Sequence, residues 1–134
     1  MSAVTTPASN GQSISVRTAV IGLVIDGGGS AITTGVKGYI QVPYDCTIVS
    51  NTLLGDQAGD LVVDVWKDTY ANFPPTGGDS IAGSAKPTLS SAAKSTDVTL
   101  AGWTVQVRAG DVIGFNVDSA ATITRATLEL RVVR

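Results

Sequence analysis

Apolar and polar positions alternate with a period of two along most of the chain. The clearest windows lie at residues 60–66, 113–117 and 128–133. Their apolar sets are Leu61, Val63 and Val65; Ile113, Phe115 and Val117; and Leu128, Leu130 and Val132. Such alternation is typical of β-strands that place one face on a core. No window carries the apolar spacing of an amphipathic helix, and the Ser90–Lys94 stretch is expected to hold a single helical turn, no more.

The pattern predicts about eight strands, separated by glycine-containing turns such as Asp26–Gly29 and Asp56–Gly59, because glycine supplies the positive φ of tight turns. The expected strands are Ser13–Asp26, Ala31–Val42, Thr47–Leu54, Asp60–Trp66, Asp97–Leu100, Thr104–Val107, Asp111–Val117 and Thr122–Val133. Short strands at this spacing indicate an all-β fold, namely a single-domain antiparallel β-sandwich that is jelly-roll-like.

Two segments depart from this rhythm. Residues 1–12 are polar and are interpreted as an extended N-terminal arm, which leaves residues 13–134 as the β-sandwich domain. The candidate assembly contacts of the arm are Val4, Pro7 and Ile14, which we expect to touch another subunit. The second segment, Lys67–Thr96, is interpreted as a long connection, and a connection of this length is usually functional or covers the end of a sheet.

Composition adds an expectation of partners. The chain has 134 residues, which suits one domain with one core. Apolar residues make up 43% and charged residues only 15%, against an ordinary charged share of about 25%. Because monomers rarely leave large apolar patches in water, we expect some apolar surface to be buried in a homo-oligomer or against a larger assembly.

Charge and targeting signals narrow the partner classes. The net charge is −2, and the nine basic residues are scattered among eleven acidic ones, so neither nucleic acid nor a membrane surface is an expected partner. Residues 1–10 lack the features of a signal peptide, and the longest apolar run, Ala19–Ile25, is far shorter than the roughly 20 residues that span a bilayer. We therefore expect synthesis as a soluble cytoplasmic chain.

Catalytic chemistry has few candidates. The sequence contains no histidine, and its single cysteine, Cys46, follows Asp45, whose charge raises a thiol pKa. We expect no enzyme activity, cofactor or metal. Most aspartates adjoin Gly, Ser or Thr and are interpreted as turn formers: Asp56, Asp60, Asp79, Asp97 and Asp111. Asp64 is different because it lies in mid-strand with no obvious structural reason, so it is the first carboxylate to inspect.

Aromatic side chains supply the remaining candidate site. Trp66, Tyr70 and Phe73 are candidate contacts for a partner or for a glycan, and with Trp103 they are the candidate sugar-binding platform, since aromatic faces stack on sugar rings. The alternative, which also applies to Trp103, is that these side chains anchor the core or a loop by burying a large area.

Three stretches carry a family resemblance: DLVVDVWKDTYANFPPT (Asp60–Thr76), DSIAGSAKPTLS (Asp79–Ser90) and DVTLAGWTVQVRAGDVIGFNVDSAATITRATLELRV (Asp97–Val132). Together they resemble a β-sandwich module that recurs in virion proteins of tailed bacteriophages and prophages. The similarity covers about Val36 to Arg134. It implies a non-enzymatic particle component located in the virion, and the module is used both in small head proteins and in tail fibres.

Two functions follow as the main hypotheses, and an unrelated carbohydrate-binding module or hydrolase ranks third. The first is a capsid decoration, or cement, protein that grips the major capsid protein or another virion protein as an oligomer. The second is a tail-fibre or receptor-binding domain that recognises host surface carbohydrate through Trp66, Tyr70 and Phe73. The short polar stretch at the N-terminus favours the first, because a fibre tip usually needs an attachment region.

Overall fold

The computed structural model describes residues 17–134, which form β-strands and two short 3-10 turns. Val4, Pro7 and Ile14, the predicted arm contacts, lie outside the described residues. The elements in chain order are β1 (Thr18–Asp26), β2 (Gly35–Gln41), β3 (Cys46–Asp68), η1 (Tyr70–Asn72), η2 (Gly77–Asp79), β4 (Thr88–Asp97), β5 (Gln106–Val107), β6 (Val112–Ala121) and β7 (Arg125–Val133).

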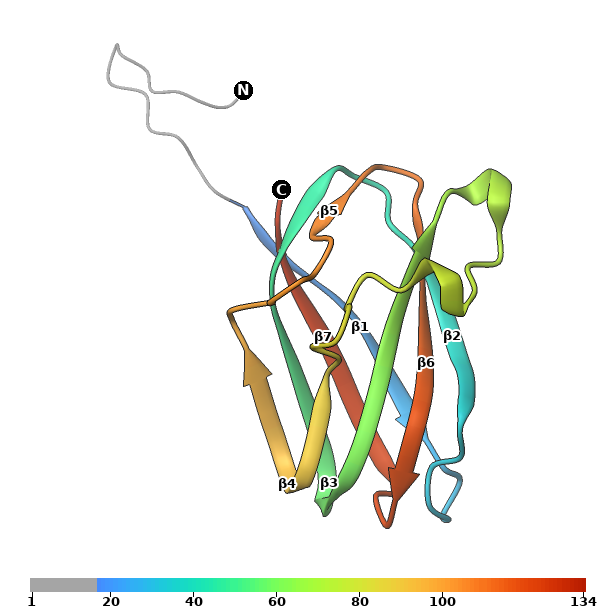
Figure 1. Ribbon diagram of the computed structural model, residues 1–134, viewed down its shortest axis with the longest axis vertical. Helices are drawn as coiled ribbons and strands as arrows, with labels where there is room; N and C mark the ends of the chain where they lie inside the picture. Colours follow the sequence, from blue (N-terminus) through green and yellow to red (C-terminus); the bar gives the residue numbers. More distant parts are fainter. Residues whose placement is uncertain (1–16) are drawn as a thin grey trace, which may run out of the picture.

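All strand pairs are antiparallel, and they form one sheet in the order β1-β7-β3-β6-β2, with β4 and β5 also pairing with β3. This sheet is folded double. β3 pairs with β7 through residues 47–55 and with β6 through residues 60–68, and Figure 1 shows β3 reversing its direction between these two parts. β4 follows the same bend, because its end pairs with residues 51–54 and its start with residues 61–62.

The fold is therefore a jelly-roll-like sandwich of two layers, as the sequence predicts. The β1 layer contains β1, β7, the first part of β3 and the end of β4. The β2 layer contains β2, β6, the second part of β3 and the start of β4. β3 and β4 each serve both layers, and the short β5 pairs with the first part of β3, so the sheet has seven strands where about eight were expected.

One core lies between the layers. The alternating apolar sets all point into it: Leu61, Val63, Val65, Ile113, Phe115, Val117, Leu128, Leu130 and Val132 are each fully buried. Trp103 joins this core and donates its indole N–H to the Ala85 carbonyl at 2.8 Å. Trp103 is thus an anchor of the interior, which is one of the two roles that the sequence left open.

The bends of β3 and β4 and the turn between β6 and β7 gather at one end of the sandwich (Figure 1). Carboxylates join them. Asp56, in the bend of β3, accepts the backbone N–H groups of Thr124 and Arg125 at 3.1 and 3.2 Å, and it also accepts the Thr124 hydroxyl. Asp60 accepts the N–H of Ser91 in the bend of β4 at 2.7 Å. Gly59 is required here, because a Cβ would lie 2.8 Å from the Ala121 carbonyl oxygen.

Several predicted boundaries are wrong. The Lys67–Thr96 connection contains β4, and Ser90–Lys94 is strand rather than a helical turn. β4 was missed because it is a sheet edge with weak β-formers and only one buried side chain, Leu89. The expected strand Asp97–Leu100 is a turn, since Asp97 accepts the N–H groups of Thr99 and Leu100.

Other boundaries shift by a few residues. The two strands expected at 47–54 and 60–66 are one bent strand, β3, with a register shift between Leu54 and Gly59 in place of a separate turn. β2 and β5 are shorter than expected, β6 runs on to Ala121, and β7 begins at Arg125. β1 begins at Thr18, and positions 13–16 of the expected first strand lie outside the described range.

Candidate functional site

The two outer faces of the sandwich differ in what lies over them. We call the outer surface of the β2 layer the covered face, because residues 69–87 cross it and bury its central positions Asp64 and Gly114. We call the outer surface of the β1 layer the open face, where the central positions Gly22, Thr127 and Glu129 remain partly exposed. All the site residues that the sequence predicts within the described range belong to the covered side.

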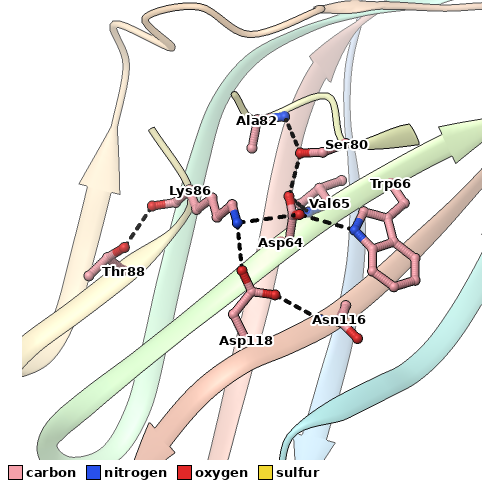
Figure 2. A network of polar contacts seen from close by, with 9 residues as sticks. All are labelled: Asp64, Val65, Trp66, Ser80, Ala82, Lys86, Thr88, Asn116 and Asp118. Carbon is pink, nitrogen blue, oxygen red and sulfur yellow. Dashed lines mark hydrogen bonds and ion pairs between the residues drawn. The ribbon is translucent and has the colours of Figure 1, made fainter. Parts of the chain in front are cut away.

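Asp64 is the centre of the covered face. Its neighbours in β3, Val63 and Val65, point into the core, so its own side chain points outward, beneath residues 80–86 (Figure 2). One carboxylate oxygen accepts the Ser80 hydroxyl at 2.6 Å, and the other accepts the Trp66 indole N–H at 3.0 Å. Asp64 is 5% exposed. This mid-strand carboxylate therefore holds residues 69–87, which we call the connection, against the sheet.

Lys86 extends this network. Its ammonium group lies 3.6 Å from Asp64 and 2.6 Å from Asp118, whose second oxygen accepts the Asn116 amide at 2.7 Å (Figure 2). The hydrogen bond to Asp118 is the main cause that raises the pKa of Lys86, and the charge of Asp64 adds to it. Lys86 thus stays protonated and acts as a cation shared by two carboxylates, which suits positioning better than proton transfer.

A second contact holds the connection at β2 and β6. Phe73 packs edge-on against Tyr39, with ring centroids 4.9 Å apart. Gly114 lies in register with both Tyr39 and Trp66. A Cβ at Gly114 would lie 3.2 Å from Pro75 and 3.3 Å from the Tyr39 ring. The lack of a side chain at Gly114 therefore lets Pro75 pack directly against the sheet.

Within the predicted aromatic trio, Trp66 and Phe73 make different contacts. Trp66 is tied to Asp64 and serves the network, whereas Phe73 pairs with Tyr39. Tyr70, in η1, is 70% exposed. Tyr39 was missed as a site residue, although its outward position in an alternating strand is a signal that could have identified it. The exposed aromatic set on this side is Tyr39, Tyr70 and Phe73.

Of the carboxylates predicted to form turns, Asp79, Asp97 and Asp111 bond to backbone two or three residues away, whereas Asp56 and Asp60 join segments that are distant in the chain. Asp79 accepts the backbone N–H of Thr76 at 2.8 Å, and Asp111 accepts that of Arg108 at 3.0 Å. Asp56, Asp60 and Asp97 also accept backbone N–H groups. Within residues 17–134, no group of three or more His, Cys, Asp or Glu side chains could hold a metal ion.

Cys46 is a buried free cysteine at the start of β3. Burial raises the pKa of its thiol, and the charge of neighbouring Asp45 raises it further, in the direction expected from the sequence. A thiol that is both buried and protonated is a poor nucleophile. Cys46 therefore belongs to the core.

The open face carries exposed aliphatic side chains. Val20 and Val24 of β1 are 51% and 59% exposed, and Leu54 of β3 is 43% exposed. Val24 and Leu54 lie in one row, on either side of Thr127 in β7. Charged side chains surround the aliphatic ones: Glu129 and Arg131 follow each other at alternate positions of β7, and Lys94 of β4 lies beside Leu54. Asp26 and Arg125 form an ion pair at the end of β1. The open face is therefore an aliphatic group bordered by charges of both signs.

Comparison with known proteins adds no assignment. No protein-family model matches the chain, and no curated protein matches it either. Across residues 17–134, the structure contains no helix that is long and apolar enough to cross a membrane.

Proposed function

We propose that this chain is a non-enzymatic structural protein of a bacteriophage particle, a capsid decoration protein that binds the head shell as an oligomer. The observation that carries the proposal is the open face. It presents Val20, Val24 and Leu54 to solvent from a regular sheet, and large exposed apolar surfaces usually mark protein-protein contacts. Burial of such a surface stabilises an assembly by about 25 cal/mol per Å² of apolar area, before the costs of association.

The covered face supports the non-enzymatic part of the proposal. Each polar side chain at its centre is engaged in holding the connection: Asp64 accepts two side-chain donors and Lys86 lies between two carboxylates. A hydrolase needs an acid or base that is free to exchange protons with substrate. The network instead resembles the internal bracing of a protein whose task is to keep its shape.

One observation favours a second candidate function. Tyr39 and Phe73 pack against each other and are each partly exposed, and Tyr70, three residues before Phe73, is 70% exposed. Exposed aromatic faces suit sugar rings, so a tail-fibre or receptor-binding domain for host surface carbohydrate is the alternative. Under this alternative, the group includes Tyr39 in place of Trp66, because Trp66 is held by Asp64.

The copy number in purified particles tests the proposal. We expect quantitative mass spectrometry to find hundreds of copies per particle, and imaging of intact particles to place the chain on the shell. A handful of copies, located at the tail, would contradict the decoration function and favour the alternative.

Two variants test which outer face of the sandwich binds the particle. Leu54→Lys charges the open face at an exposed position and should weaken binding of the purified chain to undecorated particles. Tyr70→Ala is its counterpart on the other side and should leave particle binding unchanged. The reverse pattern, together with loss of binding to a glycan array in Tyr70→Ala, would support the carbohydrate-binding alternative.

A further inference from the structure

The β1 strand forms a free edge of the β1 layer. Its only strand partner within the described residues is β7, and the two pair without a register shift from Thr18 to Asp26. The sequence of this edge is TAVIGLVID, which contains no proline and no charge before its last residue. Long, regular and uncharged edges are the ones that accept another strand, so natural proteins usually protect them.

Hydrogen bonding shows which groups face the free edge. The N–H of Gly27 donates to the Thr124 carbonyl oxygen, and the N–H of Arg134 donates to the Arg17 carbonyl oxygen. Positions 17 and 27, both odd-numbered, are therefore hydrogen-bonded to their partners on the β7 side of the ladder. Because such pairs alternate along an antiparallel ladder, the odd positions of β1 bond toward β7. The even positions therefore direct their N–H and C=O groups outward. They are Thr18, Val20, Gly22, Val24 and Asp26.

The other edges carry the protection that β1 lacks. β2 has a register shift between Val36 and Gly38, with Lys37 at the shift. β4 has a residue in the left-handed region, Ser91 at φ 48°, and it carries Lys94. Bulges and lysines of this kind prevent the addition of a strand. Among the edges of the described sandwich, β1 is the one prepared for pairing.

We propose that β1 pairs antiparallel with β1 of a second copy of this chain, about a two-fold axis at Gly22, so that the two β1 layers form one continuous sheet. This register uses the whole strand and places the outward-bonding even positions opposite one another. Val20 then faces Val24 of the second copy, Gly22 faces its own equivalent, and Thr18 faces Asp26. Each of these pairs exchanges two N–H to C=O hydrogen bonds, as a two-fold interface requires.

Side chains on both surfaces of the strand fit this register. On the open face, each copy contributes Val20 and Val24, which meet as two valine pairs around the paired glycines, and β-branched pairs favour such ladders. On the inner side, Ile21 of one copy faces Leu23 of the other. Leu23 is only partly buried and gains an apolar neighbour there.

Charge does not oppose the pairing. The charged neighbours in β7 are Glu129 beside Gly22 and Arg131 beside Val20. In the paired sheet, each of these side chains is separated from its equivalent by both β1 strands, and the strand spacing of about 4.8 Å keeps the two roughly 14 Å apart or more. At physiological ionic strength this exceeds the screening length of about 8 Å.

The inference deepens the proposed function, since it names the surface through which the decoration oligomer forms. Its test uses the purified full chain alone. A failure of the pairing would therefore leave particle binding to be decided separately, by copy number and by Leu54→Lys.

The first experiment measures the oligomeric state by analytical ultracentrifugation. We expect a concentration-dependent dimer. Val24→Lys should weaken the dimer by at least about tenfold in Kd, because it places a lysine at the centre of the interface. Leu54→Lys is the matched control, since it adds the same charge to the same face on an interior strand, and it should leave the Kd unchanged. A monomeric wild-type chain, or equal effects of the two variants, would overturn the pairing.

The second experiment tests the register. In the double variant Val20→Cys/Val24→Cys, directly opposed positions lie about 5.5 Å apart between Cα atoms, which suits a disulfide. The two cysteines of one chain are about 13 Å apart along the strand and cannot bridge each other. We expect oxidation to give dimers in which peptide mapping finds residue 20 joined to residue 24. Dimers that form without this bridge would mean that another segment occupies the edge, and would overturn the proposal.

Discussion

The two outer faces of the sandwich have a similar arrangement of side chains but differ in what packs on them. Each has a glycine at its centre, Gly114 on the covered face and Gly22 on the open face, with bulkier side chains beside it. At Gly114 the chain itself supplies the occupant, because Pro75 rests between Tyr39 and the glycine. At Gly22 nothing within 17–134 does so, and Val20 and Val24 remain half exposed or more.

The difference lies in the polar anchors. The covered face contains Asp64, which fixes Ser80 and Trp66, and Lys86, which joins Asp64 to Asp118. These directional bonds add to the apolar contacts of the same segment, in which Ile81 and Ala82 are buried in the core. The open face offers aliphatic side chains and free backbone groups at its edge. Those are the features that a partner strand can use, which is why we assign bracing to one face and assembly to the other.

The largest expected effect comes from removing the central anchor. Asp64→Ala leaves the Ser80 hydroxyl, the Trp66 indole N–H and the Lys86 charge without their shared acceptor, so we expect a loss of about 3 kcal/mol in unfolding free energy. Urea denaturation at a fixed protein concentration measures it. Glu129→Ala on the open face is the matched change and should cost about 0.5 kcal/mol or less. Equal losses would remove the contrast between the faces.

The second-largest effect tests the packing of Pro75 against Gly114. Gly114→Ala introduces a Cβ within 3.2 Å of Pro75, and this overpacking should cost about 1–2 kcal/mol. It should also lift the connection, so limited proteolysis within residues 69–79 should accelerate. Thr127→Ala, in the central row of the open face, should not change that cleavage rate. Unchanged cleavage in Gly114→Ala would show that Pro75 does not hold the segment.

A smaller effect is expected for the aromatic contact. A double-mutant cycle of Tyr39→Ala and Phe73→Ala should give a coupling of about 0.5–1.5 kcal/mol, as for other edge-to-face pairs. The comparable cycle on the open face joins Val24→Ala and Leu54→Ala, which lie on either side of Thr127. Its coupling should stay within about 0.5 kcal/mol of zero, because the two side chains do not touch across an intervening strand.

The sequence predicted the inward side of this molecule better than the outward side. Period-two alternation depends only on burial, so Leu61, Phe115 and Leu128 could be predicted as core residues. The two-layer fold could be predicted from the same alternation. β4 has no such signal, since its Ser-, Ala- and Lys-rich residues lie at an edge. The sequence could not show that it continues both layers.

The covered face was predictable in part. Asp64 was notable because a carboxylate interrupts an apolar strand, and that anomaly did mark the centre of the site. Its partners Ser80 and Lys86 follow 16 and 22 positions later in the chain, on a connection whose path depends on Pro75 finding Gly114. Contacts of that kind depend on tertiary structure, and no local pattern contains them.

The smallest expected effect is a pH dependence confined to the covered face. The folded state raises the pKa of Lys86 above its ordinary value of 10.5, chiefly through the hydrogen bond to Asp118. A raised pKa means that the stabilisation is fully present below pH 10.5 and is lost as the pH rises through the folded value. The difference in unfolding free energy between wild type and Lys86→Met should thus be constant from neutral pH to about pH 9.5 and should shrink above that.

Other groups that titrate at high pH are common to both proteins and cancel in this difference. Asp118→Asn supplies the control, because it removes the main cause of the shift while keeping Lys86. In that background the alkaline loss attributable to Lys86 should be smaller, since only Asp64 at 3.6 Å still favours the charged amine. If the difference between wild type and Lys86→Met grew with pH instead, Lys86 would be destabilising in its charged form, and the covered face would owe its closure to Pro75 and Phe73 rather than to its ionic network.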